Sequence, residues 1–234
     1  MLYSGSKSKI AKHILPIMLS DKSDSQWYVE PFCGGGNMID KVPGKRIGND
    51  ANKNLIGFWR AIQRGWVPPD NLTREEYYDI KARQEEVDDC LVAFAAAPCS
   101  FGAKWWGGYA FNKAGKNYAA AAKRNIVKQA PSVSDVVFTC VDYRKMYVPE
   151  NSVVYCDPPY KGTAGYQSSF DTDSFWDWCR ATSDSGHSVF VSEIDAPDDF
   201  EVVWEKEVGV RMDKNRVSSR VERLYTLKGR SQHG

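Results

Sequence analysis

Four consecutive residues, Asp157 to Tyr160, place a carboxylate, two prolines and a phenol ring directly after an apolar run. The run, residues 153–156, predicts a short buried strand, and the prolines must end it because they cannot donate to a sheet ladder. The polar groups would then lie at the carboxyl edge of a sheet, where open α/β sheets bind ligands. An ordinary turn would also explain these residues, since Asp and Pro are both common in turns.

The same four residues suit chemistry at an exocyclic amino group of a nucleobase. Such a nitrogen is a poor nucleophile because its lone pair is delocalised into the ring. The Asp157 carboxylate and the Pro158 carbonyl could accept its two N–H groups, and the Tyr160 ring could stack on the base. The sequence therefore predicts a site that activates an amino nitrogen.

A glycine-rich turn near the N-terminus forms a second group of interest. Residues 26–30 predict a strand, the next seven residues include three consecutive glycines, and a second predicted strand, 45–49, ends at Asp50. Glycines let the backbone approach a ligand closely, and an acid after the second strand can accept ribose hydroxyls. The pattern predicts the front of a Rossmann-like nucleotide site, although it is not the strict dinucleotide phosphate cradle.

Hydrophobic periodicity and turn signals predict the elements that position these groups. A capping box at Thr73 and Glu76 is expected to open the third helix, and the last two strands are expected to flank an irregular basic stretch, 211–216. The order indicates an α/β fold. We expect helices at 7–19, 55–64, 73–97, 119–129 and 172–180, and further strands at 136–141, 189–193, 202–207 and 222–227.

Residues 101–130 differ from the rest of the chain, because they hold six Lys or Arg and no Asp or Glu. Glycines, aromatic rings and lysines together indicate a loop that binds nucleic acid, with bases stacked and phosphates neutralised. The alternatives are a solvated lysine face and tryptophans that belong partly to the core. The predicted DNA-binding residues are Lys104, Trp105, Trp106, Asn112, Lys113, Lys116 and Arg124.

The composition predicts a globular protein of 234 residues with one large α/β domain, or a catalytic domain with a small insertion. The net charge of +1 does not by itself indicate a nucleic-acid-binding protein. No apolar run approaches the ~18 residues of a membrane span, and the first residues do not form a signal peptide, so we expect an intracellular protein. Six scattered cysteines without a Cys-x-x-Cys pair predict buried thiols and no metal site.

Four motifs occur in an order that resembles the Dam-type DNA adenine methyltransferases, including phage-encoded members. They are residues 3–7, 30–37, 50–52 and 154–160. The resemblance implies a Rossmann-like fold that binds S-adenosylmethionine, with a small, mostly helical or loop target-recognition insertion. It implies methylation of the N6 amino group of a flipped adenine in double-stranded DNA, in the cytoplasm of a bacterial host, by a monomer or weak dimer. Restriction-modification is one possible setting.

The resemblance also implies domain boundaries and site residues. The catalytic domain would comprise residues 1–60 and 131–234, and the insertion residues 61–130. Asp157, Pro158 and Tyr160 would be catalytic. The implied cofactor contacts are Tyr3, Lys7, Phe32, Gly34, Gly36, Asp50, Asp142, Tyr143 and Asp157.

The sequence departs from the family pattern at two places. The first motif has one glycine and a serine before Lys7 where two glycines are usual, which is a mild change. The insertion is short and does not match the enterobacterial recognition domain, so no target sequence is implied. The alternatives are an enzyme acting on the amino group of cytosine or of an RNA base, and an inactive nucleic-acid-binding relative.

Overall fold

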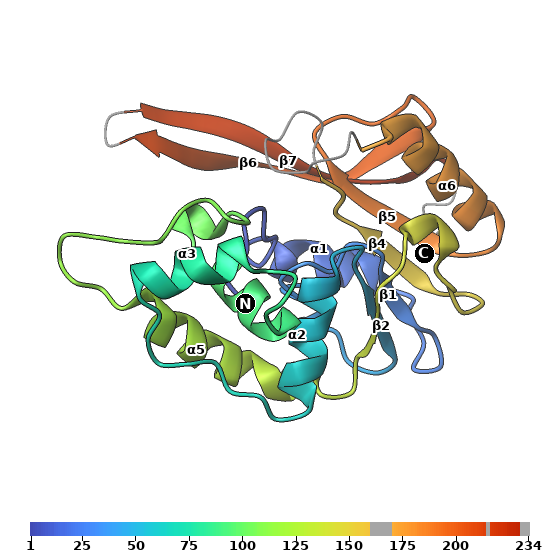
Figure 1. Ribbon diagram of the computed structural model, residues 1–234. Coiled ribbons are helices and arrows are strands. Elements are labelled where there is room, and N and C mark those ends of the chain that lie inside the picture. The colour runs from blue at the N-terminus through green and yellow to red at the C-terminus, as the bar shows by residue number, and fades with distance from the viewer. Residues whose placement is uncertain (160–169, 214–215, 230–234) are drawn as a thin grey trace.

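A computed structural model of the chain describes residues 1–159, 170–213 and 216–229. A seven-stranded sheet with the order β3-β2-β1-β4-β5-β7-β6 forms its centre (Figure 1). The strands from β1 to β5 pair in parallel, and β7 runs antiparallel to β5 and β6. The predicted α/β class and Rossmann-like sheet are confirmed. The strands are β1 (Tyr28–Glu30), β2 (Arg46–Asn49), β3 (Val137–Thr139), β4 (Val153–Cys156), β5 (Ser188–Glu193), β6 (Phe200–Asp213) and β7 (Arg216–Leu227).

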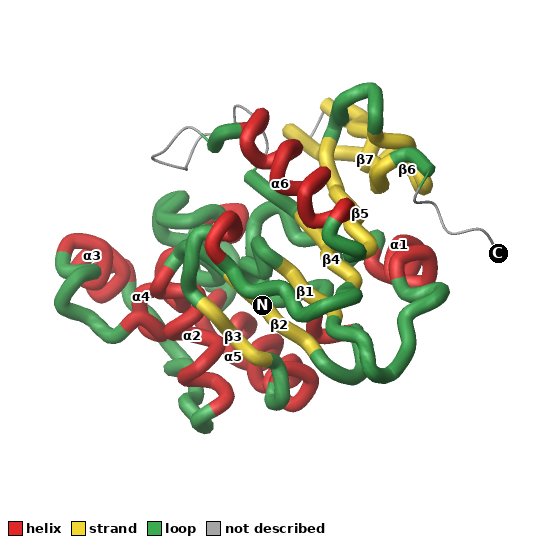
Figure 2. Tube along the Cα trace, turned by 90° about the vertical axis from the view of Figure 1, so that its right-hand side faces the viewer, coloured by secondary structure: helices red, strands yellow, loops and turns green. Residues whose placement is uncertain are grey.

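Helices cover both faces of this sheet (Figure 2). Within the described ranges, no helix is both long and apolar enough to cross a membrane. The α-helices are α1 (Ala11–Met18), α2 (Lys53–Gln63), α3 (Arg74–Ala82), α4 (Asp89–Ala96), α5 (Tyr118–Gln129) and α6 (Thr172–Asp184). The 3-10 helices are η1 (Ile39–Lys41), η2 (Phe101–Ala103), η3 (Ala130–Val133) and η4 (Tyr143–Lys145).

Strand side chains alternate between two hydrophobic clusters, as the two-residue period of a strand requires. Tyr28 and Tyr155 face the cluster that includes α1, α2, α4 and α5. Their neighbours Val29 and Val154 face a cluster that includes α6. This two-sided burial fixes the register of the central strands, and therefore the residue at which each strand ends.

The prediction of one helix over 73–97 was wrong, although its capping box at Thr73 and Glu76 is present. The chain forms α3, a surface helix with Tyr77 and Ile80 buried, and then α4, in which six of eight residues are buried. Residues 83–87 form turns and a bend between the two helices, and this break lets α3 stay at the surface while α4 lies in the core.

The region 61–130, predicted as an insertion, shares its core with the sheet. Phe94 of α4 and Ile126 of α5 belong to the same cluster as Tyr28 and Tyr155 of the sheet. The proposed boundary at residue 61 lies inside α2, which packs along α4. The division into a catalytic domain and an insertion stays a prediction.

The C-terminal hairpin is longer than predicted. Strands β6 and β7 pair from Phe200 and Leu227 as far as Asp213 and Arg216, with two register shifts, so most of the stretch expected to be irregular is strand. The sequence analysis missed this extension because its formation depends on the pairing of β6 with β7 rather than on local propensity. The hairpin projects beyond the rest of the sheet (Figure 1), since β5 pairs only with residues 223–226 of β7.

Candidate active site

A cavity of about 320 Å³ lies at the carboxyl ends of β1, β2 and β4. Three acids mark these ends: Glu30 is the last residue of β1, and Asp50 and Asp157 directly follow β2 and β4. Parallel strands place such residues at one edge of the sheet, where ligands bind in open α/β folds. The cavity is lined by Tyr3, Ser4, Gly5, Ser6, Lys7, Glu30, Phe32, Cys33, Gly34, Gly35, Asn37, Met38, Asp50, Ala103, Lys104, Trp105, Tyr155, Asp157, Pro158 and Pro159.

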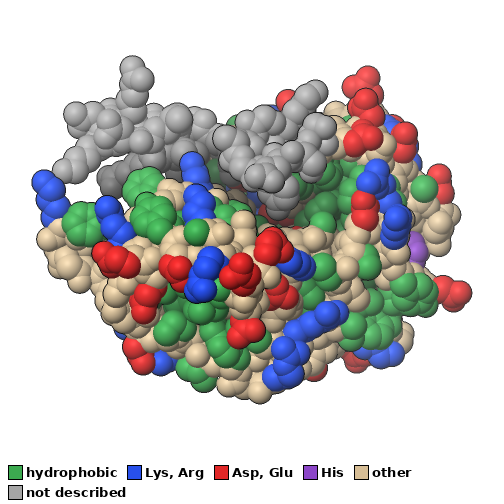
Figure 3. Space-filling model, viewed as in Figure 1, with side chains coloured by type: hydrophobic (Ala, Val, Ile, Leu, Met, Phe, Trp, Pro, Cys, Tyr) green, Lys and Arg blue, Asp and Glu red, His purple; other side chains and the backbone are tan. Residues whose placement is uncertain are grey.

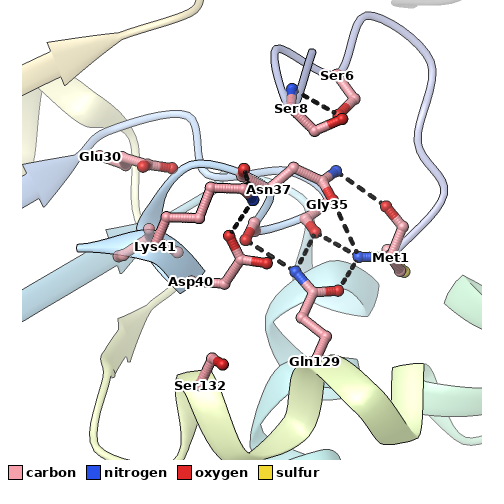
Figure 4. A network of polar contacts seen from close by, with 12 residues as sticks. Met1, Ser6, Ser8, Glu30, Gly35, Asn37, Asp40, Lys41, Gln129 and Ser132 are labelled. Carbon is pink, nitrogen blue, oxygen red and sulfur yellow. Dashed lines mark hydrogen bonds and ion pairs between the residues drawn. The ribbon is translucent and has the colours of Figure 1, made fainter. Parts of the chain in front are cut away.

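The first residues of the chain lie across the glycine-rich turn and form one wall of the cavity. Asn37 Nδ2 donates to the Met1 carbonyl at 2.9 Å, and Gln129 Nε2 donates to the Gly36 carbonyl at 2.9 Å (Figure 4). The Met1 α-amino group donates to the Gly35 carbonyl at 2.7 Å. These bonds tie the N-terminal segment, the turn and α5 together, so they hold the wall in place.

The turn requires glycine because other parts of the chain approach its backbone closely. Gly34 and Gly36 have φ angles of 43° and 61°, in the left-handed region that other residues rarely adopt. A Cβ atom on Gly34 would lie 2.9 Å from the Tyr3 ring, and one on Gly36 would lie 3.0 Å from the Trp59 ring. The glycines therefore admit Tyr3 on the cavity side and Trp59 on the core side.

Asp50 is buried beneath this turn and accepts two backbone hydrogen bonds. Gly34 N–H donates to its Oδ2 at 3.1 Å, and Asn52 N–H donates to its Oδ1 at 2.9 Å. Burial nevertheless outweighs these bonds and raises the pKa of Asp50 from 3.8 to about 6. Because burial shields the Asp50 carboxylate from water, any further hydrogen-bond donor that enters the cavity would stabilise its ionised form.

Glu30 is a second buried acid in the cavity wall. Its Oε1 accepts a hydrogen bond from the Tyr28 hydroxyl at 2.9 Å. Burial raises the pKa of Glu30 well above 4.5, and this bond opposes the rise only in part. Glu30 is therefore easier to protonate than an exposed glutamate.

Lys7 lies between two carboxylates at the edge of the cavity. Its Nζ is 2.8 Å from Asp157 Oδ1 and 3.8 Å from Glu222 Oε2. The Lys7 side chain is 3% exposed, whereas that of Asp157 is 23% exposed. The Asp157 carboxylate is therefore partly exposed to the cavity and is paired with the buried Lys7 ammonium group.

Most of the predicted site residues come together here. Tyr3, Lys7, Phe32, Gly34, Asp50, Asp157 and Pro158 all line the cavity. Gly36, Asp142 and Tyr143 do not, and Tyr160 lies outside the described residues. The roles given to these residues stay predictions.

Asp142 and Tyr143 lie beside the cavity rather than in its wall. The Tyr143 ring packs on the Phe32 ring with centroids 5.1 Å apart, so it supports a residue that lines the cavity. Asp142 caps η4 and accepts from Arg144 Nε at 2.9 Å. The hydrogen bond from this guanidinium lowers the pKa of Asp142 to about 2.

The two adjacent tryptophans have different environments. Trp105 lines the cavity together with Lys104. Trp106 turns inward: its Nε1 donates to Gln84 Oε1 at 3.0 Å, and its ring packs on Tyr77 with centroids 5.3 Å apart. Lys104 and Trp105 therefore form part of the cavity wall, while Trp106 mainly joins α3 to the loop.

Other residues predicted to bind DNA lie further along the same segment. Asn112 and Lys116 line a second cavity of about 320 Å³, and Lys113 and Arg124 are exposed. Lys123 pairs with Asp70 at 2.7 Å, so an acid from outside the basic block neutralises part of it. On the face shown in Figure 3, Lys and Arg side chains are interspersed with Asp and Glu rather than forming a continuous patch.

The sequence analysis did not identify Glu222 and Glu193, two carboxylates near Asp157, as site residues. Glu222 on β7 is buried and faces Lys7, and Glu193 at the end of β5 has a pKa raised to about 7, mainly by burial and also by Asp157. The sequence offered only a weak signal for Glu193, namely that it ends a predicted parallel strand. Glu222 could not be placed without the antiparallel register of β7.

The sequence is similar to a known protein family and to individual proteins of known name. Residues 3–193 match the sequence model of a family described as D12 class N6 adenine-specific DNA methyltransferase. Two Vibrio cholerae O1 proteins, from strains O395 and N16961, are named DNA adenine methylase. Each is 25% identical over 155 residues, covering 56% of this chain and 55% of the relative, so the chain spans about half the length of these relatives.

Two solved structures are similar at a lower level. TrmN from Thermus thermophilus is 10% identical, with 94% of this chain and 48% of that one covered and a TM-score of 0.41. SMU.472, solved in complex with SAH, is 15% identical, with 97% and 53% covered and a TM-score of 0.40. No conclusion about function follows from similarity at this level.

Proposed function

This chain belongs to the D12 class N6 adenine-specific DNA methyltransferase family, and we propose that it transfers a methyl group from S-adenosylmethionine to the N6 amino group of adenine in double-stranded DNA. The observation that carries the proposal is that one cavity is lined both by Asp50 and the glycine-rich turn and by Asp157 and Pro158. One half of this cavity suits a nucleoside, and the other half suits an amino nitrogen.

The residues present fit S-adenosylmethionine. Asp50 is a buried acceptor with a raised pKa, which suits the hydroxyls of a ribose. Gly34 and Gly35 let Tyr3 and Asn37 pack directly on the turn, so the turn and the N-terminal segment form one continuous wall for the cofactor. Phe32 offers an aromatic wall that Tyr143 supports from behind. The cofactor supplies an electrophilic methyl group on its sulfonium.

In the proposed mechanism the protein prepares the acceptor nitrogen. The Asp157 carboxylate and the Pro158 carbonyl accept the two N–H groups of adenine, which localises the nitrogen lone pair. The Tyr160 ring stacks on the flipped base and offsets the few kcal/mol that flipping costs. Catalysis then consists mainly of positioning and hydrogen-bond acceptance.

The mechanism needs no covalent intermediate on the protein, and the thiols agree with this. Cys33 lines the cavity and Cys156 directly precedes Asp157. Burial raises the pKa of both thiols well above 9.0, so they stay protonated and unreactive at neutral pH.

The cavity mouth supports a nucleic-acid substrate. Phe101 is 69% exposed, and the loop that it opens carries Lys104 and Trp105 to the cavity wall. An exposed ring beside a lysine suits base stacking next to a phosphate contact. We assign Lys104, Trp105, Lys113, Lys116 and Arg124 to this DNA contact surface.

The test is methyl transfer from labelled S-adenosylmethionine to unmethylated genomic DNA, followed by mass analysis of the nucleosides. We expect N6-methyladenine from the wild type and from Asp24→Ala, which removes an exposed acid elsewhere. Asp157→Ala should lose roughly 10²- to 10³-fold in rate at saturating cofactor, the usual effect of removing one preorganised hydrogen-bonding group.

Other outcomes would contradict specific parts of the proposal. N4-methylcytosine as the product would overturn the assignment of the base. Cofactor binding without a methylated nucleoside would overturn DNA as the substrate. Near-normal turnover by Asp157→Ala would overturn the mechanism.

A further inference from the structure

Among the described residues, the Lys7 ammonium group lies near acceptors from three parts of the chain. It lies 2.8 Å from Asp157 after β4, 3.8 Å from Glu222 on β7 and 3.3 Å from the Gly5 carbonyl. The Lys7 and Glu222 side chains are 3% and 8% exposed, so neither charge is well hydrated. Buried charges at these distances depend strongly on one another.

The pairing of Lys7 with Asp157 conflicts with the role proposed for Asp157. Lys7 Nζ lies 2.8 Å from Oδ1, within the distance at which an ammonium donates a strong hydrogen bond. An ammonium in that place withdraws electron density from the carboxylate and competes with an incoming amino group. Asp157 Oδ2 can accept while Lys7 holds Oδ1, but the carboxylate regains its full strength as an acceptor when Lys7 moves away from Oδ1 as the substrate arrives.

Among the described residues, Glu222 is the carboxylate besides Asp157 that lies within 4 Å of Lys7 Nζ, so it is placed to receive the ammonium group. A buried ammonium that leaves one acceptor without reaching another loses its compensation, which is strongly unfavourable. Glu222 is already 3.8 Å away, so a shift of roughly 1 Å would bring Lys7 to hydrogen-bonding distance. Its backbone is fixed because β7 pairs with both β5 and β6.

We infer that Glu222 is a positioning residue that takes over the Lys7 ammonium group when the amino group of the target base binds to Asp157. The inference rests on the proposed function, because it assumes that Asp157 accepts an N–H group of the substrate. Glu222 touches neither substrate nor cofactor in this scheme. It acts by leaving Asp157 free to accept.

The charges around Asp157 give the inference a pH signature. Facing it are Lys7 from the N-terminal segment, Glu30 from β1 and Glu193 from β5, with Glu222 behind Lys7. Loss of the negative charge at Glu222 makes the remaining carboxyls easier to ionise. The acid limb, which is the fall in the rate of methyl transfer at low pH, should therefore move to lower pH in a Glu222→Gln variant.

The experiment compares Glu222→Gln with Glu205→Gln. Glu205 lies on the adjacent strand β6 and pairs with Arg223 at 3.2 Å, so its substitution removes one carboxylate from the same hairpin but not from Lys7. Single-turnover methylation of unmethylated genomic DNA would be measured from pH 5.5 to 9 at saturating S-adenosylmethionine. Dissociation constants for cofactor and DNA would be measured for each variant.

We expect Glu222→Gln to slow single-turnover transfer roughly 10- to 100-fold, as a misplacement of about 1 Å does, with an acid limb at lower pH. Both dissociation constants should stay within about threefold, and Glu222→Asp should recover part of the rate. A rate and acid limb equal to those of Glu205→Gln would overturn the inference. Loss of cofactor binding together with rate would also overturn it, since that indicates a structural role.

The proposed function fails in a different way. In that case neither the wild type nor Glu205→Gln transfers a methyl group to DNA, and the inference falls with it. If both transfer normally and Glu222→Gln does as well, only the inference is wrong.

Discussion

Asp50 offers a prediction that needs no knowledge of the DNA target. Its carboxyl is buried under the glycine-rich turn, and burial raises its pKa from 3.8 to about 6. The folded protein therefore holds this proton more tightly than the unfolded chain does. Asp50 contributes stability below about pH 4, and this contribution is lost as the pH rises through about 6. The substitution Asp50→Asn removes the titration.

The magnitude follows from the size of the shift. A rise of about 2 pKa units corresponds to about 3 kcal/mol between the fully protonated and fully ionised limits. Within the range pH 8 to pH 5, titration with a folded pKa of about 6 gives about 1.4 kcal/mol of this. Asp50 is 7% exposed, so solvent screening reduces these values little. Changed hydrogen bonds from Gly34 and Asn52 add an offset that does not vary with pH.

Urea unfolding of the wild type and Asp50→Asn at pH 5, 6, 7 and 8 would measure the effect. The free energy of unfolding of the wild type minus that of Asp50→Asn should rise by about 1.4 kcal/mol from pH 8 to pH 5. Other titrating groups cancel in this difference. Asp24→Asn, at an exposed acid, controls for the loss of one carboxyl. A difference that stays constant with pH for Asp50→Asn would refute the reasoning.

Two further predictions concern the helical layer and the DNA surface. Gly57→Ala should destabilise the protein by about 1 to 3 kcal/mol in thermal unfolding, because its Cβ would lie 2.4 Å from Asp89 Cβ where α2 crosses α4; an unchanged Tm would contradict this packing. Lys104→Ala and Lys116→Ala should each lower DNA affinity at all sequences and reduce the salt slope by about 1; a slope equal to that of the wild type would remove the lysine from the contact surface.

Sequence reasoning predicted the sheet well because most of its strands carry local signals. The run before Asp157 and the glycines after Glu30 each indicate where a strand must end. The long hairpin was underestimated because its pairing depends on contacts between β6 and β7 rather than on local propensity. The break between α3 and α4 was missed because it depends on how deeply each helix is buried, which a single sequence does not state.

Some residues of the candidate site were likewise predictable from the sequence, and others were not. Asp50 and Asp157 were predictable because each follows a recognisable strand in a parallel sheet. Glu222 was not predicted as a site residue, since its distance from Lys7 depends on the antiparallel register of β7. Trp105 and Trp106 have identical side chains in adjacent positions, and only the turn of the backbone sends one to the cavity and the other to Tyr77.

The placement of Lys7 has a consequence for synthesis of the protein. Its partner Asp157 is 150 residues further along the chain, and Glu222 follows later still. At the pace of translation, roughly 8 to 30 s separate Lys7 from Asp157 as the chain leaves the ribosome. During that time an ammonium group that ends up buried must remain in water. The N-terminal wall of the cavity can therefore close only after most of the polypeptide has been made, which ties activity to completion of the sheet.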